Sequence, residues 1–118
     1  MGSPKLRSAL RALGITRRES TSAFALIPTA RGHVMAEAVH APSAAGDALR
    51  IAVRDSAFVE RGTTWGERAV AGRPIDWAVG RRFEVAVFTD DQGVAFHLAG
   101  EHGSVAFAAE QLLASTRV

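Results

Sequence analysis

The sequence contains no cysteine, which excludes a disulfide framework and any metal site built on thiolates. It also has no apolar run close to the roughly 20 residues that a membrane-spanning helix requires. Residues 1–15 lack the continuous apolar stretch of a signal peptide. We therefore expect no membrane span, and either a cytoplasmic location or secretion without a signal peptide.

Sequence signatures of catalysis are scarce as well. No two histidines have the HxH or HExxH spacing, and only His102, in "GEHG", has a carboxylate beside it. No serine lies in a G-x-S-x-G turn, and no phosphate loop or dinucleotide fingerprint is present. Turn chemistry explains Asp90 and Asp91 without a calcium ion. The sequence predicts a protein that is not an enzyme and has no cofactor or metal, with a small β-barrel enzyme or carrier as a remaining alternative.

Basic residues are concentrated at the N-terminus. Residues 1–18 contain five basic and no acidic residues, whereas the rest of the chain contains nine basic and twelve acidic residues. The body is therefore mildly acidic, which argues against a nucleic-acid-binding surface. A basic arm can contact an acidic partner, although a solvated helix face is the simpler explanation. The arm also has the Arg- and Ser-bearing, acid-free composition of a weak organellar targeting segment.

Apolar periodicity predicts a short N-terminal helix followed by strands. Leu6, Leu10 and Leu13 fall on one helical face, and Gly14 ends the helix. Strands are expected at residues 21–28, 33–40, 48–55, 56–62, 82–88, 93–99 and 104–108, whereas residues 63–80 are expected to be turn-rich and the tail after 108 is ambiguous. Many short strands separated by turns are typical of an antiparallel β-sandwich or barrel. We predict an all-β sandwich at residues 19–118, with residues 1–18 as a basic helix or arm.

The stretch "LRIAVRDSAFVERGTTWGER", residues 49–68, concentrates the residues able to recognise a ligand. They are Arg50, Arg54, Arg61, Trp65, Glu67 and Arg68. Arg50 and Arg54 project from the same side of the expected strand because they are four residues apart. An indole can stack on the C–H face of a sugar, and charged side chains can bind its hydroxyls. The alternative is that Trp65 packs in the core while the charged residues form surface ion pairs.

The order of motifs from residue 49 onward resembles the galectin carbohydrate-recognition domain. "WGER" is similar to the family's W-G-x-E-x-R stretch, and "RPIDWAVGRRFEVAVF" is similar to its PF-x-x-G-x-x-F-x-V-x-I segment. "GVAFHLAGEHGSVAF" is similar to its F-x-V-x-V-N-G-x-H-x-x-x-F hairpin, with Gly100 and His102 at the matching positions. The resemblance implies a galectin-like jelly roll of two sheets that binds β-galactosides without a metal.

The same resemblance implies roles for individual residues. Trp65 would be the stacking platform, and Arg54 would match the arginine of the family's H-x-N-x-R strand, which is "RIAVR" here. Glu67 and Arg68 would match the acidic and basic residues that follow the tryptophan. The expected partner is then a glycan or glycoprotein.

Three departures from the galectin pattern support a second hypothesis. Arg50 and Ala52 replace the histidine and asparagine of H-x-N-x-R, and Arg61 stands where an asparagine is expected. Loss of these polar contacts weakens a shallow sugar site, because each net hydrogen bond contributes about 1 kcal/mol. The alternative is the same fold without sugar binding, used as a protein-interaction or assembly module that could form a homo-oligomer.

Overall fold

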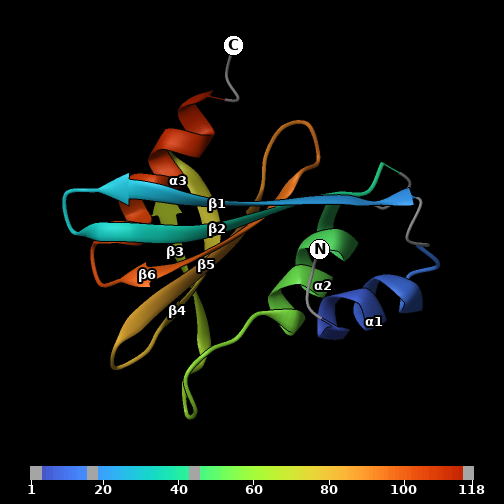
Figure 1. The fold of residues 1–118 in the computed structure, drawn as a ribbon, viewed down its shortest axis with the longest axis horizontal. Coiled ribbons are helices and arrows are strands. Elements are labelled where there is room, and N and C mark those ends of the chain that lie inside the picture. The colour runs from blue at the N-terminus through green and yellow to red at the C-terminus, as the bar shows by residue number, and fades with distance from the viewer. Residues whose placement is uncertain (1–3, 16–18, 43–45, 116–118) are drawn as a thin grey trace.

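A six-stranded antiparallel sheet with helices on both faces forms the protein, as described by a computed structural model for residues 4–15, 19–42 and 46–115 (Figure 1). The helices are α1 (Pro4–Ala12), α2 (Gly46–Ser56) and α3 (Ser104–Ser115). The strands are β1 (Thr21–Thr29), β2 (Gly32–His40), β3 (Trp65–Val70), β4 (Arg73–Val79), β5 (Phe83–Thr89) and β6 (Ala95–Glu101). Across the sheet their order is β1-β2-β6-β5-β4-β3. The expected antiparallel, β-rich architecture and the N-terminal helix are confirmed.

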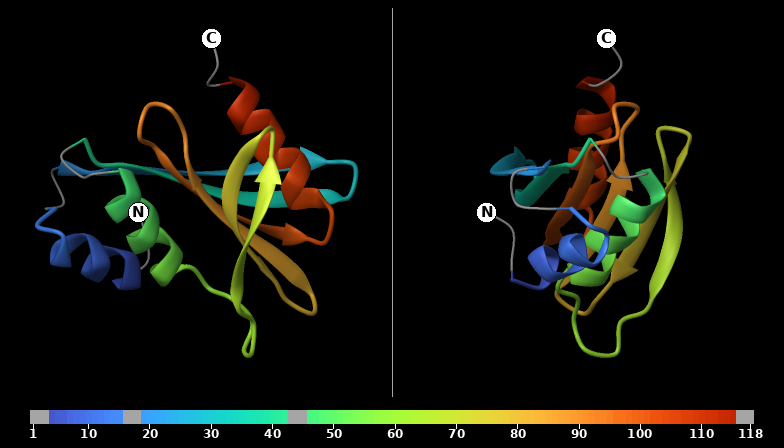
Figure 2. Two further views of the ribbon diagram at one scale, coloured as in Figure 1. Left: turned by 180° about the vertical axis from the view of Figure 1, so that it is seen from behind. Right: turned by 90° about the vertical axis from the view of Figure 1, so that its right-hand side faces the viewer.

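The expected second sheet is not observed, because one sheet accounts for all the described strands. Helices cover its two faces instead (Figure 2). Leu6 and Leu10 of α1 and Leu49 and Val53 of α2 pack over one face, which we call the α1–α2 face. Val105, Ala108 and Leu113 are among the α3 residues that pack over the other, the α3 face. The two-sheet sandwich and the jelly roll are therefore not confirmed.

Two segments expected as strands are helices. Within residues 48–55, Leu49, Ala52 and Val53 are buried, whereas Ile51 is 40% exposed, so burial follows helical and not alternating spacing. An aspartate in the first turn of α2 and an arginine in its last turn also suit the helix dipole. Residues 104–108 likewise begin α3, whose buried residues recur at three and four positions.

Two further expectations for the middle of the chain are wrong. Residues 56–62, expected as a strand, form a loop after α2, apart from Ser56, which ends that helix. The segment expected to be turn-rich contains the β3–β4 hairpin, in which Val70 pairs with Arg73 around a two-residue turn. Ala71 and Gly72 have φ angles of 51° and 76° in this turn. Positive φ at both central positions is the geometry of a type I′ hairpin turn, and alanine gives little sign of it in a sequence.

Because helices cover both faces of the sheet, the central strands are buried on both sides. In β5, the five residues from Glu84 to Phe88 are buried, although their side chains alternate between the faces. In β6, Leu98 and Ala95 are both 0% exposed, although they point to opposite faces. The alternating pattern of these strands therefore does not mark one dry and one wet face, because side chains on both faces are buried.

Two turn hydrogen bonds determine where each strand directs its backbone groups. The Gly80 N–H donates to the Phe83 carbonyl (2.9 Å), and the Asp90 N–H donates to the Val94 carbonyl (3.0 Å). In an antiparallel ladder, successive residues direct their N–H and C=O groups to opposite neighbours. The pairing registers extend this alternation from each strand to the next. In β4, the backbone N–H and C=O groups of even-numbered residues therefore point toward β5. In β1, the backbone N–H and C=O groups of even-numbered residues point away from β2, to the outer edge of the sheet.

The buried centre of the sheet predicts where truncation is costly. Leu98→Ala should lower the free energy of unfolding by about 2–5 kcal/mol, because removing this fully buried side chain leaves a cavity between the sheet and α3. The control Leu13→Ala removes a side chain that is 43% exposed and should cost less than about 1 kcal/mol. Urea denaturation of both variants measures the difference, and equal losses would contradict this assignment of the core.

Candidate functional site

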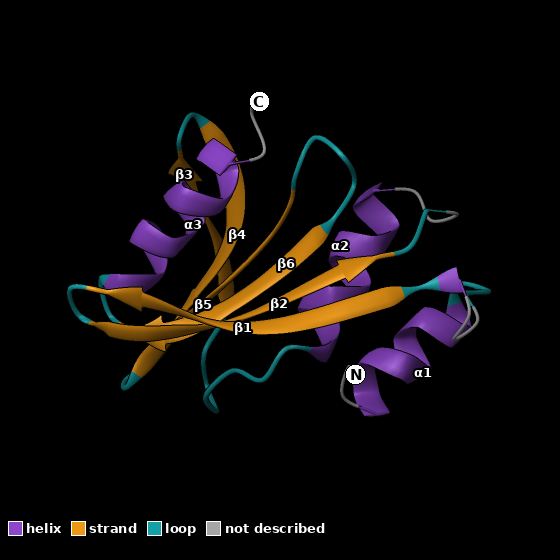
Figure 3. Ribbon diagram, turned by 45° about the horizontal axis from the view of Figure 1, so that its top comes forward, coloured by secondary structure: helices purple, strands orange, loops and turns teal. Residues whose placement is uncertain are grey.

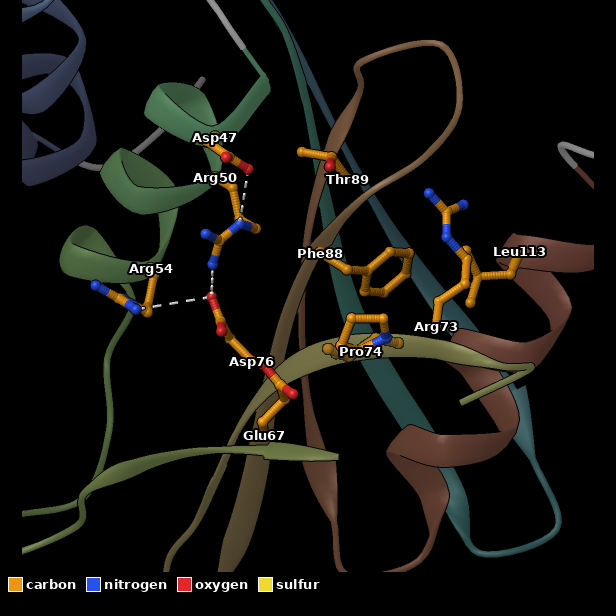
Figure 4. Close-up of a pocket in the computed structure, with 11 residues that line it drawn as sticks. Asp47, Arg50, Arg54, Glu67, Arg73, Pro74, Asp76, Phe88, Thr89 and Leu113 are labelled. Carbon is orange, nitrogen blue, oxygen red and sulfur yellow. Dashed lines mark hydrogen bonds and ion pairs between the residues drawn. The ribbon is translucent and has the colours of Figure 1, made fainter. Parts of the chain in front are cut away.

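A pocket of about 360 Å³ opens where β4 separates from β5 (Figure 4). The β4–β5 pairing ends at Asp76 and Val87, although both strands continue past these residues. Two positions further on, the register would place Pro74 opposite Thr89. Proline has no N–H to donate to a neighbouring strand, so the ladder cannot continue normally there. Pro74 is thus a sequence feature that accounts for the opening.

The pocket has a charged wall and an apolar wall. Its lining residues are Asp47, Arg50 and Arg54 of α2, Glu67 of β3, Arg73, Pro74, Ile75 and Asp76 of β4, Phe88 and Thr89 of β5, and Leu113 of α3. Figure 4 shows Arg50 and Arg54 of α2 directed toward Asp76, with Phe88 and Pro74 on the opposite side. Hydrogen-bond donors, acceptors and an apolar surface therefore meet in one cavity.

Asp76 organises the charged wall. Its side chain is 14% exposed, it accepts a hydrogen bond from Arg50, and its Oδ2 lies 3.8 Å from Nη1 of Arg54. Arg50 and Arg54 reach the same carboxylate because they are one helical turn apart on α2. The two guanidinium groups thus link α2 to β4 through a shared, largely buried anion.

The other charged contacts of the pocket lie closer to solvent. Asp47 Oδ1 lies 3.8 Å from Arg50 Nε, and the Asp47 side chain is 90% exposed. On the opposite side, Arg73 Nη1 lies 3.1 Å from Oδ1 of Asp91, whose side chain is 64% exposed. Water screens such pairs, so they stabilise the fold by at most about 1 kcal/mol each.

The six residues expected to form one sugar site lie in different places. Arg50, Arg54 and Glu67 come together at the pocket. Trp65, on the same face of β3 as Glu67, is partly buried and packs against the apolar clusters of the α1–α2 face. The sugar hypothesis needs a solvent-facing indole beside Arg54, and this packing favours a structural role for much of the ring.

The remaining two expected residues do not line the pocket. Arg61 is exposed in the turn before β3. Arg68 points to the α3 face, where its Cζ lies 4.8 Å from the ring centroid of Trp77. Trp77 itself is 5% exposed and its Nε1 donates to Glu84 Oε2 (3.1 Å). The tryptophan that contacts an arginine is therefore Trp77, a core residue that the sequence motif did not indicate.

The outer strand β1 is a second candidate site (Figure 3). Its nine residues, TSAFALIPT, include no charged side chain. Phe24 and Leu26 are 53% and 67% exposed, and Met35, which pairs with Leu26, is 47% exposed. All three point to the α1–α2 face, and we call them the apolar edge patch. On its outer side β1 pairs with no other described strand.

The opposite edge of the sheet differs in both length and charge. Strand β3 has six residues, and Glu67 and Arg68 lie exposed near its middle. Charged residues and short length are two ways in which proteins prevent an edge strand from pairing with another chain. Strand β1 has neither, and Pro28 near its end is its one typical edge-protecting residue.

No protein-family model matches this chain. Searches of curated proteins and of solved structures find no significantly similar protein either. The resemblance to galectins thus stays a prediction. Among the described helices, none combines the length and apolar character needed to cross a bilayer.

The contribution of the Asp76 carboxylate to the stability of the protein can be measured. Asp76→Asn should lower the free energy of unfolding by about 1–3 kcal/mol, because two partly buried guanidinium groups lose the largely buried carboxylate that they share and keep only the exposed Asp47 and Asp55. The control Asp91→Asn removes an exposed partner of Arg73 and should cost less than about 1 kcal/mol. Thermal and urea denaturation report both values, and a cost at Asp91 equal to that at Asp76 would show that Asp76 does not organise the pocket.

Proposed function

We propose that this chain is a non-catalytic protein-interaction module that receives an extended strand of a protein partner along the outer edge of β1. The supporting observation is the exposed apolar surface on a long, uncharged edge strand. Buried β-sheet backbone groups are almost always hydrogen-bonded, and an edge with free groups is a template for another strand. Addition of a strand to such an edge is a recurring mode of peptide recognition.

Backbone and side-chain contacts would contribute different parts of the binding energy. Ser22, Phe24 and Leu26 direct their N–H groups outward and would pair with the partner's carbonyls in any sequence. Phe24 and Leu26 would cover apolar side chains of the partner, at about 25 cal/mol for each Å² of apolar area buried. The preferred partner is therefore an extended segment with apolar residues at alternate positions and no charge opposite β1.

A random peptide library displayed on phage tests this interaction, because it samples extended segments of every composition. Peptides selected on the immobilised wild-type protein should bind Phe24→Lys at least tenfold more weakly, because a charge then lies in the apolar edge patch. Phe107→Lys is the matched control, because Phe107 is also 53% exposed but belongs to α3, which covers the face of the sheet opposite to the apolar edge patch. Fluorescence anisotropy with labelled peptides measures both affinities.

Two results would count against the proposal. The first is that selected peptides bind Phe24→Lys and Phe107→Lys equally well, which would place their site elsewhere. The second is that repeated selections on folded protein that sedimentation shows to be monomeric yield no binding peptide. Circular dichroism of each variant confirms that folding is retained, which is expected because both side chains are at the surface.

Carbohydrate binding is a second candidate function, and the charged pocket is the observation that favours it. Arg50, Arg54 and Glu67 were each expected to bind sugar hydroxyls, and they line one cavity with Asp76. The mixture of donors, acceptors and the apolar ring of Phe88 suits a sugar, which presents hydroxyls and C–H groups together. On this proposal the β-galactoside class is the first to examine, and Trp65 lies on the same strand as Glu67.

Lactose titration followed by tryptophan fluorescence tests the sugar proposal, together with a glycan array. Arg54→Gln and Glu67→Gln should each weaken binding about tenfold, because one hydrogen bond of about 1.4 kcal/mol is lost. Arg81→Gln, an exposed arginine in the β4–β5 turn, should leave the affinity unchanged. Absence of any signal from folded wild-type protein on both assays would reject carbohydrate binding.

A further inference from the structure

We infer that the strand received by β1 is β1 of a second copy of this chain. The two sheets then join edge to edge about a twofold axis that passes between the two Ala25 residues. This inference rests on the proposed use of the β1 edge and names its partner. An antiparallel pair of identical strands is self-complementary, because each contact of one copy is repeated by the other. The uncharged β1 can approach its own copy without repulsion between like charges.

The backbone of β1 supports this register. Centred on Ala25, the pairing places Phe24 of one copy opposite Leu26 of the other. Both residues direct their N–H and C=O groups to the outer edge, so they form hydrogen-bonded pairs on either side of the axis. Ser22 would donate to the carbonyl of Pro28 in the second copy. The missing N–H of proline therefore removes only the outermost bond at each end.

The side chains support the same register. A twofold axis perpendicular to the sheet keeps the α1–α2 faces of both copies on one side. Phe24 of each copy then contacts Leu26 of the other, and Met35 lies next to Leu26 within each copy. The two apolar edge patches merge into one covered surface. A register centred on Ala23 would place Phe24 opposite Ser22 and would leave much of this apolar surface exposed.

Charges beyond the two ends of β1 favour the Ala25 register. Glu19 precedes the strand, and Arg31 lies in the turn that follows it; both are exposed. The pairing directs the start of one β1 toward the end of the other, so that the backbone position of Glu19 lies opposite that of Arg31 of the second copy at each end of the joined strands. Within one chain the Arg31 side chain lies beside Gly103, and it would turn outward to meet Glu19 of the second copy. Opposite charges at the rim of an interface favour the correct register and speed association. A register centred on Phe24 would place Glu19 opposite the uncharged Thr29 instead.

Engineered cysteines test the register, because the natural chain has none. In the Ala25 register, the two Ala25 residues form a non-hydrogen-bonded pair with Cα atoms about 4.5 Å apart, within the range that a disulfide spans. Mild oxidation of Ala25→Cys should therefore yield a disulfide-linked dimer at least tenfold faster than oxidation of Ala23→Cys. In the control variant Ala23→Cys, each cysteine lies opposite Ile27 of the second copy, which is four residues along the strand from that copy's cysteine. Non-reducing electrophoresis measures both rates.

Sedimentation tests the charges at the two ends of β1. The wild-type protein should show a concentration-dependent dimer, and Glu19→Arg should weaken dimerisation several-fold by placing it near Arg31 of the second copy. Arg31→Glu in the same chain should restore dimerisation, because the opposite charges are exchanged and not removed. Phe24→Lys should give a monomer, whereas Phe107→Lys should dimerise like wild type.

The result that would overturn self-pairing is a monomer at all concentrations together with equal oxidation rates for Ala25→Cys and Ala23→Cys. If phage-selected peptides still bind through Phe24 in that case, the edge receives a strand of a different protein and the proposed function stands. If no peptide depends on Phe24 either, both the dimer and the proposed function fail. A wild-type dimer that Phe24→Lys does not weaken would also overturn the inference, since it would form through another surface.

Discussion

Backbone hydrogen bonding between strands is the constraint on which this structure and both its candidate sites depend. The ladder is continuous through the buried centre of the sheet, where β2, β6 and β5 pair. It stops after the Asp76–Val87 pair, where Pro74 follows in the register and the charged pocket opens, and on the outer side of β1, where no described strand follows. Each interruption leaves a surface that can accept a ligand or another strand, and the surrounding side chains determine which. Arginines and carboxylates surround the first, and apolar residues surround the second.

Strands β1, β2, β5 and β6 were predictable because alternation and turn residues point to the same answer. Helix α2 was not predictable, because Leu49 and Val53 would be buried in a strand as well as in a helix. Only the burial of the residues between them distinguishes the two structures. Only the packed structure shows Ala52 buried and Ile51 exposed. The β3–β4 hairpin was missed for a local reason, since Ala71 takes a conformation that glycine or asparagine usually signals. The expected second sheet followed from assigning strands to segments that form α2 and the start of α3, where the structure has one sheet covered by helices.

The candidate sites were predictable in part. Arg50 and Arg54 lie on one side of a strand or of a helix at a spacing of four, so their proximity did not depend on the correct secondary structure. Their partner Asp76 could not be identified, because it reaches them only through the hairpin that sets β4 beside β3. The exposure of Phe24 and Leu26 was also hidden from the sequence. An apolar strand with this pattern is typical of the centre of a sheet, and its place at the edge is decided by the strand order.

The central claim is that the outward backbone groups of β1 have a strand partner in the assembled protein. Residue-resolved amide hydrogen exchange across a dilution series tests it most directly. We predict that the amides of Ser22, Phe24 and Leu26 are protected at high protein concentration and exchange rapidly on dilution. The odd-numbered amides of β1, which pair with β2, should remain protected throughout. Rapid exchange of the three outward amides at every concentration, in the presence of an oligomer, would contradict the account.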